Sequence, residues 1–166
     1  MNSMEALEWR LRALEDREAI RDLIAGYGPL ADSGDARAVA DLWTGDGVYE
    51  VLGFARAQGH EAIAGLITGP VHQALMARGC GHLLGPVTIV LDGDRAELRG
   101  HSVLFRRQDS GDGFEAYRVS ANRWQLRRTA AAGHGGWRVT HRSNAVLDGD
   151  PAARLLLAAP PAHPAS

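Results

Sequence analysis

The sequence predicts an α+β fold in which helices come first and an antiparallel sheet follows. Apolar residues repeat with helical spacing over residues 5–31, and from residue 82 onward the pattern changes to the alternation that is typical of strands. Short glycine and aspartate turn sequences separate the strand-like segments at regular intervals. This order indicates helices packed on one face of a curved sheet.

The first expected element is an amphipathic helix over residues 5–31. Pro29 cannot donate a backbone hydrogen bond, so we expect a kink or break near Tyr27, with Asp32 just past the end of the helix. Asp35 then caps a second short helix that continues through Leu42-Trp43. The apolar positions that predict the first helix are Leu7, Leu11, Leu14, Ile20, Leu23, Ile24 and Tyr27.

The remaining elements follow from turn signals. Asp46-Gly47 precedes a strand over 48–52, and a helix over 61–76 is interrupted at Gly69-Pro70. The strongest hairpin signal is Asp92-Gly93-Asp94, which lies between two strand-like segments. The strands expected in the second half are 87–91, 96–106, 115–128 and 137–147.

Length and composition indicate one domain. The chain has 166 residues, of which 45% are hydrophobic, enough for a real core. We expect a single α+β domain over residues 1–150 and a C-terminal tail over 151–166. Within the tail, the triplet Leu155-Leu156-Leu157 is suited to cover a pocket or a subunit interface, and the final PPAHPAS is expected to be frayed.

Charge and cysteine content exclude several classes of function. The formal net charge is −2 and arginine is dispersed, so nucleic acid is not an expected partner. No apolar run approaches the roughly 20 residues of a membrane span, and the charged, helical start does not resemble a signal peptide. We therefore expect a cytoplasmic protein without a membrane partner. Cys80 is the single cysteine, without a CxxC companion, and is expected to pack as a small apolar residue.

Four polar groups have the residue types of a general-base pocket: Asp32, His82, His101 and the pair Ser120-x-Asn122. A carboxylate can hold an imidazole while hydroxyl and amide groups orient an oxygenated substrate. Each also has a plain structural interpretation. Asp32 can satisfy a turn, His82 can be a hydrogen-bonded core histidine, and His101 can face either the pocket or an edge.

Other aromatic and histidine residues give weaker signals. Tyr27 and Tyr49 can present a phenol to a ligand oxygen, although such residues are more often part of the core. Ser120 and Asn122 project from the same strand face, next to Trp124. The other histidines lack HxxxH or HExxH spacing, so no metal site is expected; they are His60, His72, His134, His141 and His163.

Three segments carry a family resemblance: AIRDLIAGYGPLADSGDARAVADLWTGDGVYEV, GHLLGPVTIVLDGDRAELRGHSVLF and GGWRVTHRSNAVLDGD. Together they resemble the SnoaL-like branch of the nuclear-transport-factor-2-like superfamily over about residues 5–150. The resemblance implies a cone-shaped α+β barrel with a strongly curved mixed or antiparallel sheet, and helices on its concave face. It also implies a hydrophobic pocket, no cofactor, and a homodimer or higher homo-oligomer.

The resemblance extends to individual positions. Asp32 and His82 match the Asp-His dyad of scytalone dehydratase and of related dehydratases and dehydrochlorinases, and Tyr27-x4-Asp32 is similar to the spacing in bile-acid dehydratase. Further matches to the scytalone dehydratase pocket are Tyr49, His101, Ser120 and Asn122. Two departures concern the substrate more than the fold: Ala31 replaces a tyrosine, and Gly28-Pro29 is unusual in a helix that is normally regular.

These observations lead to a hypothesis of cofactor-independent dehydration. His82 would remove a proton next to a carbonyl group, and Asp32 would hold its ring. Tyr49, Tyr27 or His101 would donate a proton, while Ser120 and Asn122 would orient the substrate. The apolar lining expected for a small hydrophobic, cyclic or polyketide-like hydroxy-carbonyl compound comes from Trp43, Leu84, Phe105 and Trp124.

Dehydration has several alternatives. Double-bond isomerisation and polyketide cyclisation begin with the same proton abstraction. A non-catalytic ligand-binding or subunit-interaction module is an alternative of a different class, because the fold does not determine the function. Epoxide hydrolysis through an Asp-Arg-Asp arrangement is a further alternative, but the sequence does not place its residues.

Overall fold

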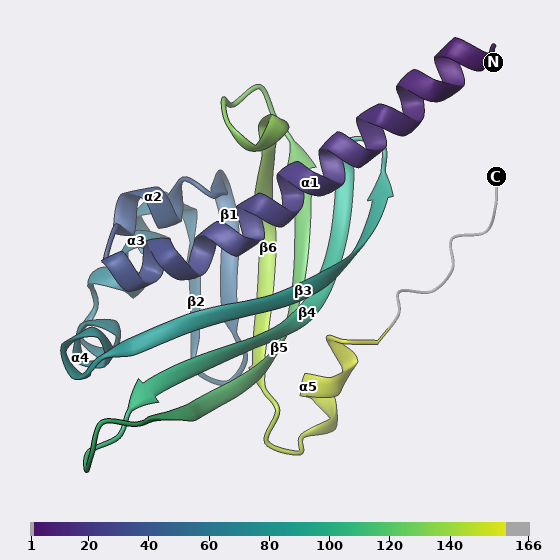
Figure 1. The fold of residues 1–166 in the computed structure, drawn as a ribbon. Helices are drawn as coiled ribbons and strands as arrows, with labels where there is room; N and C mark the ends of the chain where they lie inside the picture. Colours follow the sequence, from purple (N-terminus) through teal and green to yellow (C-terminus); the bar gives the residue numbers. More distant parts are fainter. Residues whose placement is uncertain (1, 159–166) are drawn as a thin grey trace.

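A six-stranded mixed sheet with the order β2-β1-β6-β5-β4-β3 forms the body of the protein (Figure 1). The computed structural model describes residues 2–158. The strands are β1 (Trp43–Val51), β2 (Ala55–Gln58), β3 (Cys80–Asp92), β4 (Arg95–Arg107), β5 (Phe114–Arg128) and β6 (Trp137–Val146). The helices are α1 (Ser3–Ser33), α2 (Ala36–Ala40), α3 (Gly59–Thr68), α4 (Pro70–Arg78), the 3-10 turn η1 (His134–Gly136) and α5 (Pro151–Leu155).

The predicted α+β class is confirmed. Strands β3 to β6 form an antiparallel meander, and β1 is parallel to β6 and antiparallel to β2. Register shifts in the ladders bend the sheet into an open, curved surface, because an extra residue in one strand increases local twist. The sheet is not closed: β2 and β3 are its edges.

Helix α1 crosses the concave face of the sheet and supplies much of the core (Figure 1). Its expected break near Tyr27 does not occur, since the helix continues through Ser33 and ends at Gly34 in the left-handed conformation. Asp32 therefore lies in the last turn of α1 and not beyond it. Pro29 has no N–H to donate to the carbonyl group of Ala25, four residues earlier in the helix. Both residues are exposed, so water can bond to the Ala25 carbonyl group and the proline is tolerated.

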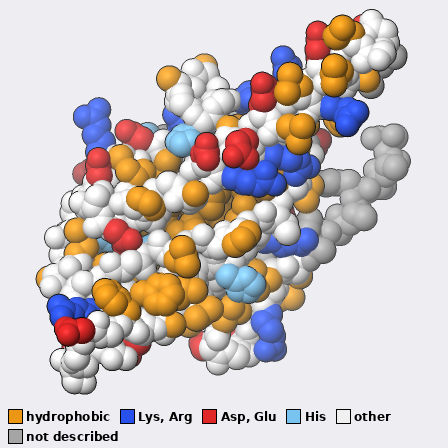
Figure 2. Space-filling model, viewed as in Figure 1, with side chains coloured by type: hydrophobic (Ala, Val, Ile, Leu, Met, Phe, Trp, Pro, Cys, Tyr) orange, Lys and Arg blue, Asp and Glu red, His pale blue; other side chains and the backbone are white. Residues whose placement is uncertain are grey.

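The N-terminal turns of α1 extend beyond the edge of the sheet (Figure 1). The space-filling view shows hydrophobic side chains on the surface of this projecting part (Figure 2). By contrast, Ile20, Leu23 and Tyr27, farther along the same helix, are buried against the sheet.

Some elements between residues 36 and 78 differ from the sequence prediction, and one agrees with it. The second helix ends at Ala40, and Trp43 begins β1, because its buried ring packs among the core aromatics as part of the sheet. The short strand β2 was not predicted. The expected interruption at Gly69-Pro70 is confirmed, and it divides the segment into α3 and α4.

The C-terminal segment packs on strands β5 and β6. Arg123 donates to the carbonyl oxygens of Leu155 and Leu156, both at 3.2 Å, which fixes the end of α5 to the sheet. Leu155 itself is exposed. None of Leu155, Leu156 and Leu157 lines the cavities described below, so the idea that the triplet covers the pocket is wrong. The sequence PPAHPAS, with His163, lies outside the described residues.

Within residues 2–158, no helix has both the length and the apolar character needed to cross a membrane.

Candidate active site

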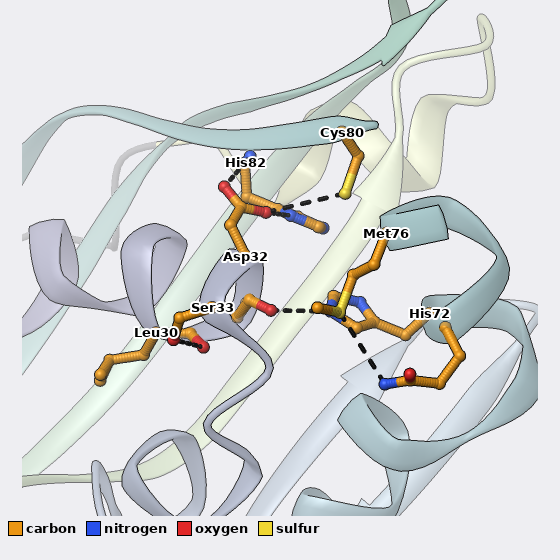
Figure 3. Close-up of polar contacts among 9 residues, drawn as sticks. Leu30, Asp32, Ser33, His72, Met76, Cys80 and His82 are labelled. Carbon is orange, nitrogen blue, oxygen red and sulfur yellow. Dashed lines mark hydrogen bonds and ion pairs between the residues drawn. The ribbon is translucent and has the colours of Figure 1, made fainter. Parts of the chain in front are cut away.

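The carboxylate of Asp32 holds His82 at two points (Figure 3). The Asp32 Oδ2 atom accepts a hydrogen bond from the His82 backbone N–H at 2.8 Å. The Oδ1 atom accepts from the ring nitrogen Nδ1 at 2.6 Å. The two bonds fix both the strand position and the ring orientation of His82, and they leave the other nitrogen, Nε2, free to accept a proton.

Backbone packing brings these two residues together. Gly28 in α1 lies against the His82 carbonyl group in β3, so closely that a Cβ atom there would overlap the carbonyl oxygen. Asp32 is one helical turn farther along, and its side chain therefore points at the start of β3. The glycine that looked unusual in the sequence is what allows the helix to approach the strand.

Burial keeps the His82 ring neutral near pH 7. Its pKa is lowered below the ordinary value of 6.5, mainly by desolvation, and the neighbouring Asp32 opposes this shift. The side chain is 19% exposed, and it lines two adjoining cavities. His82 is thus a partly buried, neutral imidazole that faces both cavities.

His72 stacks on His82, a contact that the sequence did not indicate. The ring centroids are 5.4 Å apart, and His72 is buried. Its Nε2 atom lies 2.8 Å from the Ala31 carbonyl oxygen, so Nε2 carries the proton and donates. This bond ties α4 to the last turn of α1, beside Asp32.

Arg142 is the main residue of the candidate site that the sequence did not indicate. It is 2% exposed, and its guanidinium group lies 4.3 Å from the Tyr27 ring centroid and 4.5 Å from that of Tyr49. The ring of Trp124 lies 4.1 Å away. No carboxylate of the described residues lies within 4.0 Å of it. The site therefore contains a buried cation that aromatic faces stabilise in place of a counterion.

Asn122 positions Arg142 and does not touch the cavity. Its Oδ1 atom accepts from Arg142 Nε at 3.1 Å and Nη2 at 2.8 Å, and also from Asn144 at 2.9 Å. Its amide donates to Ser102 at 2.9 Å. The remaining nitrogen, Arg142 Nη1, is buried without a hydrogen-bond partner among the described residues. Arg142 also lines the smaller cavity, so its guanidinium group lies next to the space that a ligand oxygen would occupy.

Two cavities meet at His82. The smaller has a volume of about 60 Å³, and its lining includes the polar residues Ser102, Ser120, Arg142 and Asn144. The larger, about 290 Å³, is walled mainly by apolar side chains of β1, β2, α3 and α4. The residues common to both are Tyr27, Tyr49, His82 and Arg118. A polar end joined to an apolar chamber suits a ligand with one oxygenated end.

Tyr27 remains a proton donor at neutral pH. Burial, followed by the nearby Tyr49, raises the pKa of Tyr27 far above its ordinary value. Tyr49 is half-buried and stacks on Trp43, with ring centroids 5.7 Å apart.

Several predicted residues are not at the cavity. His101 is exposed, because its face of β4 points away from the core while Leu98 and Leu104 point inward. The expectation that His101 shares a pocket with His82 is therefore wrong. Phe105 does not line either cavity, whereas Leu84 and Ser120 line the smaller one. Trp43 and Trp124 lie behind Tyr27 as buried packing partners, with ring centroids 6.1 and 6.2 Å from it.

Cys80 has companions that its sequence position did not suggest. The ligand atoms of Asp32, Cys80 and His82 lie within 4.8 Å of one another, a donor set of the kind that Zn²⁺ accepts. The Cys80 sulfur is 3.9 Å from Asp32 Oδ1. Burial and the Asp32 charge raise the pKa of the Cys80 thiol, so it stays protonated near pH 7. In that state the carboxylate is engaged by His82, and the thiol is a poor metal ligand.

A family model described as a SnoaL-like domain matches residues 12–143. The chain is similar to an NTF2-like protein with a cystatin-like fold from Novosphingobium aromaticivorans, with 56% identity and a TM-score of 0.89 over 96% of this chain and 99% of that one. None of the curated proteins compared matches the chain.

More distant structures share the fold alone. A protein of unknown function from Mycobacterium tuberculosis is 22% identical, with a TM-score of 0.71 over 91% of this chain and 82% of that one. ActVI-ORFA from Streptomyces coelicolor is 13% identical, with a TM-score of 0.67 over 79% and 97% of the two chains.

Proposed function

The chain belongs to the SnoaL-like family, and from that premise we propose that it is a cofactor-independent lyase of the dehydratase type. The family includes polyketide cyclases and dehydratases. One observation supports the proposal most: a neutral histidine fixed by a carboxylate and a buried, incompletely bonded arginine line the same small cavity.

In the first step, His82 Nε2 removes a proton from the carbon next to a carbonyl group of the substrate. The Asp32 carboxylate stabilises the imidazolium that forms, because it already accepts the Nδ1 hydrogen at 2.6 Å. The electron pair of the broken C–H bond moves onto the carbonyl oxygen, which becomes an enolate. A base positioned in this way accelerates proton transfer by about 10²–10⁴-fold.

Arg142 stabilises the enolate oxygen. Its Nη1 donor is buried and free, and the charge is not neutralised by a carboxylate of the described residues. An electrostatic group that is fixed before the reaction costs no reorganisation when the charge develops. The Asn122 oxygen and the three aromatic rings hold the guanidinium group in place.

In the second step, the enolate returns its electron pair to form the carbon–carbon double bond, and the β-hydroxyl group leaves as water. Its proton comes from the His82 imidazolium or from the hydroxyl group of Tyr49, which lines both cavities. When Tyr49 donates, the His82 imidazolium passes its proton to the tyrosinate, so both routes return His82 to its neutral form, and no redox cofactor or metal takes part in the balance. Ser120, also at the smaller cavity, orients the oxygenated end of the substrate.

The larger cavity limits the substrate class. About 290 Å³ lined by Val51, Leu66, Val71, Leu75 and similar side chains accommodates a small ring-containing or polyketide-like group. We therefore infer a hydrophobic hydroxy-carbonyl compound whose carbonyl oxygen lies at Arg142 and whose hydrocarbon part lies between α4 and β1.

Isomerisation and cyclisation begin with the same proton abstraction as dehydration, whereas a non-catalytic binding protein would remove no proton from its ligand. The test is deuterium exchange: cyclic β-hydroxy ketones are incubated with the protein in D₂O, and the α-carbon is followed by NMR. Dehydration gives exchange together with the absorbance of an α,β-unsaturated ketone. Exchange at the α-carbon without loss of water would replace the lyase with an isomerase or a cyclase.

The matched control is His82→Gln, which keeps a side chain of similar length but removes the base. We expect exchange to disappear in this variant while ligand binding, followed by chemical-shift changes, persists. Binding without exchange in the natural protein, across substrates that fill the cavity, would overturn the catalytic proposal in favour of a binding module.

A further inference from the structure

The projecting part of α1 carries an apolar stripe that the fold does not use. Met4, Leu7, Leu11 and Leu14 are 64%, 57%, 54% and 65% exposed. Their spacing alternates between three and four residues, which is the heptad pattern of a two-stranded coiled coil, with Met4 and Leu11 at position a and Leu7 and Leu14 at position d.

This stripe points away from the domain to which the helix belongs. At about 100° per residue, Leu11 and Tyr27 lie about 160° apart around the helix axis. Tyr27 is on the face that packs on the sheet, so Leu11 is on nearly the opposite face. Figures 1 and 2 show the N-terminal turns clear of the body, with hydrophobic side chains on their surface. The stripe cannot be buried by the chain's own sheet.

The arm is formed as a helix but has little support of its own. Asn2 and Glu5 make a reciprocal capping box, with hydrogen bonds of 2.9 and 2.8 Å. Polar anchoring to the body begins at Asp16, which accepts from Arg128 at 2.7 Å and from Trp137 at 3.2 Å. Helical segments of such length are marginal in water unless an apolar face is packed.

The charges beside the stripe identify the partner as a second copy. Glu8 and Glu15 occupy position e, and Arg10 and Arg17 occupy position g. In a parallel pair, position g of one helix faces position e of the next heptad in the other helix. Arg10 of each copy therefore lies opposite Glu15 of the other copy, which gives two equivalent ion pairs. In an antiparallel pair, e faces e and g faces g, so like charges would meet. Glu8, Arg10 and Glu15 make no ion pair within residues 2–158.

We propose that residues 4–14 form a parallel two-stranded coiled coil with the same segment of a second copy of this chain. The bodies do not interfere, because each sheet lies on the face of its helix opposite the seam. The apolar contact between the two helices, the seam, ends after Leu14. The next a and d positions are occupied by the charged residues Glu18 and Arg21, which pair with each other at 3.6 Å. Below that point the two helices are free to diverge toward their own domains.

Disulfide trapping tests the geometry. In a Cys80→Ser background, Leu14→Cys places a thiol at position d, where the two copies meet directly in a parallel pair. We expect a disulfide-linked dimer under mild oxidation. The matched control Arg12→Cys lies on the same turns but outside the seam and should remain unlinked. Linking only between Met4→Cys and Leu14→Cys chains in a mixture would show an antiparallel pair, in which position a meets position d, and would overturn the proposal.

Charge reversal tests the pairing independently. In sedimentation experiments on the full chain, Arg10→Glu should weaken dimerisation by about tenfold, since two attractions become two repulsions. Adding Glu15→Arg should restore it. The arm is exposed, so circular dichroism should show an intact fold in every variant. A chain that is monomeric at tens of micromolar, a dimer that ignores both changes, or an arm that binds vesicles without self-association would refute the proposal.

Discussion

Gly28 is in direct backbone contact with His82. A methyl group on Gly28 would overlap the His82 carbonyl oxygen. The same approach brings Asp32 within 2.6 Å of the His82 ring. The spacing between α1 and β3 therefore determines both the packing and the geometry of the dyad.

The first prediction is that Gly28→Ala separates α1 from β3. Overpacking in a close contact costs about 1–3 kcal/mol, and the better helix propensity of alanine offsets at most about 1 kcal/mol of it. We expect a lower free energy of unfolding, measured by urea titration, together with loss of the low-field Nδ1 proton signal of His82.

Gly26→Ala is the matched control, because a Cβ atom at Gly26 meets nothing within 4 Å. There the propensity gain of about 0.5–1 kcal/mol should appear as increased stability, with the His82 signal unchanged. If both variants behaved alike, the contact between Gly28 and His82 would not control the site.

The second prediction concerns the titration of His82. Burial lowers its pKa and Asp32 opposes that shift, so Asp32→Asn should lower the pKa further. The ring can be followed by NMR without any substrate. Once a substrate is identified, the acid limb of kcat/KM should move to lower pH in the variant, and kcat should fall by about 10²–10⁴-fold. An unchanged His82 pKa in Asp32→Asn would contradict the coupling.

Much of the fold was predictable from periodicity, because local patterns encode local structure. Except for β2, the strands, together with the hairpin at Gly93 and the cap at Asp35, follow from alternation and turn chemistry. The continuity of α1 through Pro29 was not predictable in this way. It depends on which face of the helix is open to water, and tertiary packing decides that face.

The site was predictable only in part, for a related reason. Asp32 and His82 were found from their types and from a resemblance. Arg142 was missed because the phase of β6 changes: Trp137 and Val139 are buried, and after a register shift Arg142 and Asn144 are buried instead. Strict alternation would have placed Arg142 on the outer face. The bulge in β6 reverses which side chains of the strand point into the core, and a single sequence gives no clear signal of where such a bulge occurs.

The third prediction tests whether the uncompensated charge of Arg142 matters. Asn122→Asp keeps the oxygen that accepts from Arg142 but adds a negative charge to it. Activity should fall on the order of 10²-fold, because the neutralised guanidinium stabilises an enolate less well. Full activity in this variant would remove Arg142 from the mechanism.

Asn122→Ala separates charge from structure. It leaves the donors of Arg142 and Asn144 unsatisfied, and each buried unpaired donor costs about 1–3 kcal/mol. We expect thermal unfolding to shift strongly downward in the alanine variant and much less in the aspartate variant.

The fourth prediction is that catalysis needs neither a metal nor the Cys80 thiol. Activity should survive prolonged treatment with EDTA, and Cys80→Ser should keep most of it, since the protonated thiol has no step to perform. Loss of activity on chelation, with recovery on adding Zn²⁺ in the natural chain but not in Cys80→Ser, would instead assign a metal to Asp32, Cys80 and His82.

The last prediction is a pH dependence of stability that comes from His82. Its pKa is lower in the folded chain than the ordinary 6.5 of an exposed histidine, so protonation favours unfolding. The stability linked to His82 is complete above about pH 6.5 and declines as the pH falls through the lower, folded-state pKa. His134, whose pKa burial also lowers, contributes with the same sign. The informative quantity is therefore the difference between the natural protein and His82→Gln, measured by urea unfolding at pH 7.5 and pH 5. The loss on acidification should be smaller in His82→Gln, and an equal loss would mean that the ring is solvated and is not the buried base that the mechanism requires.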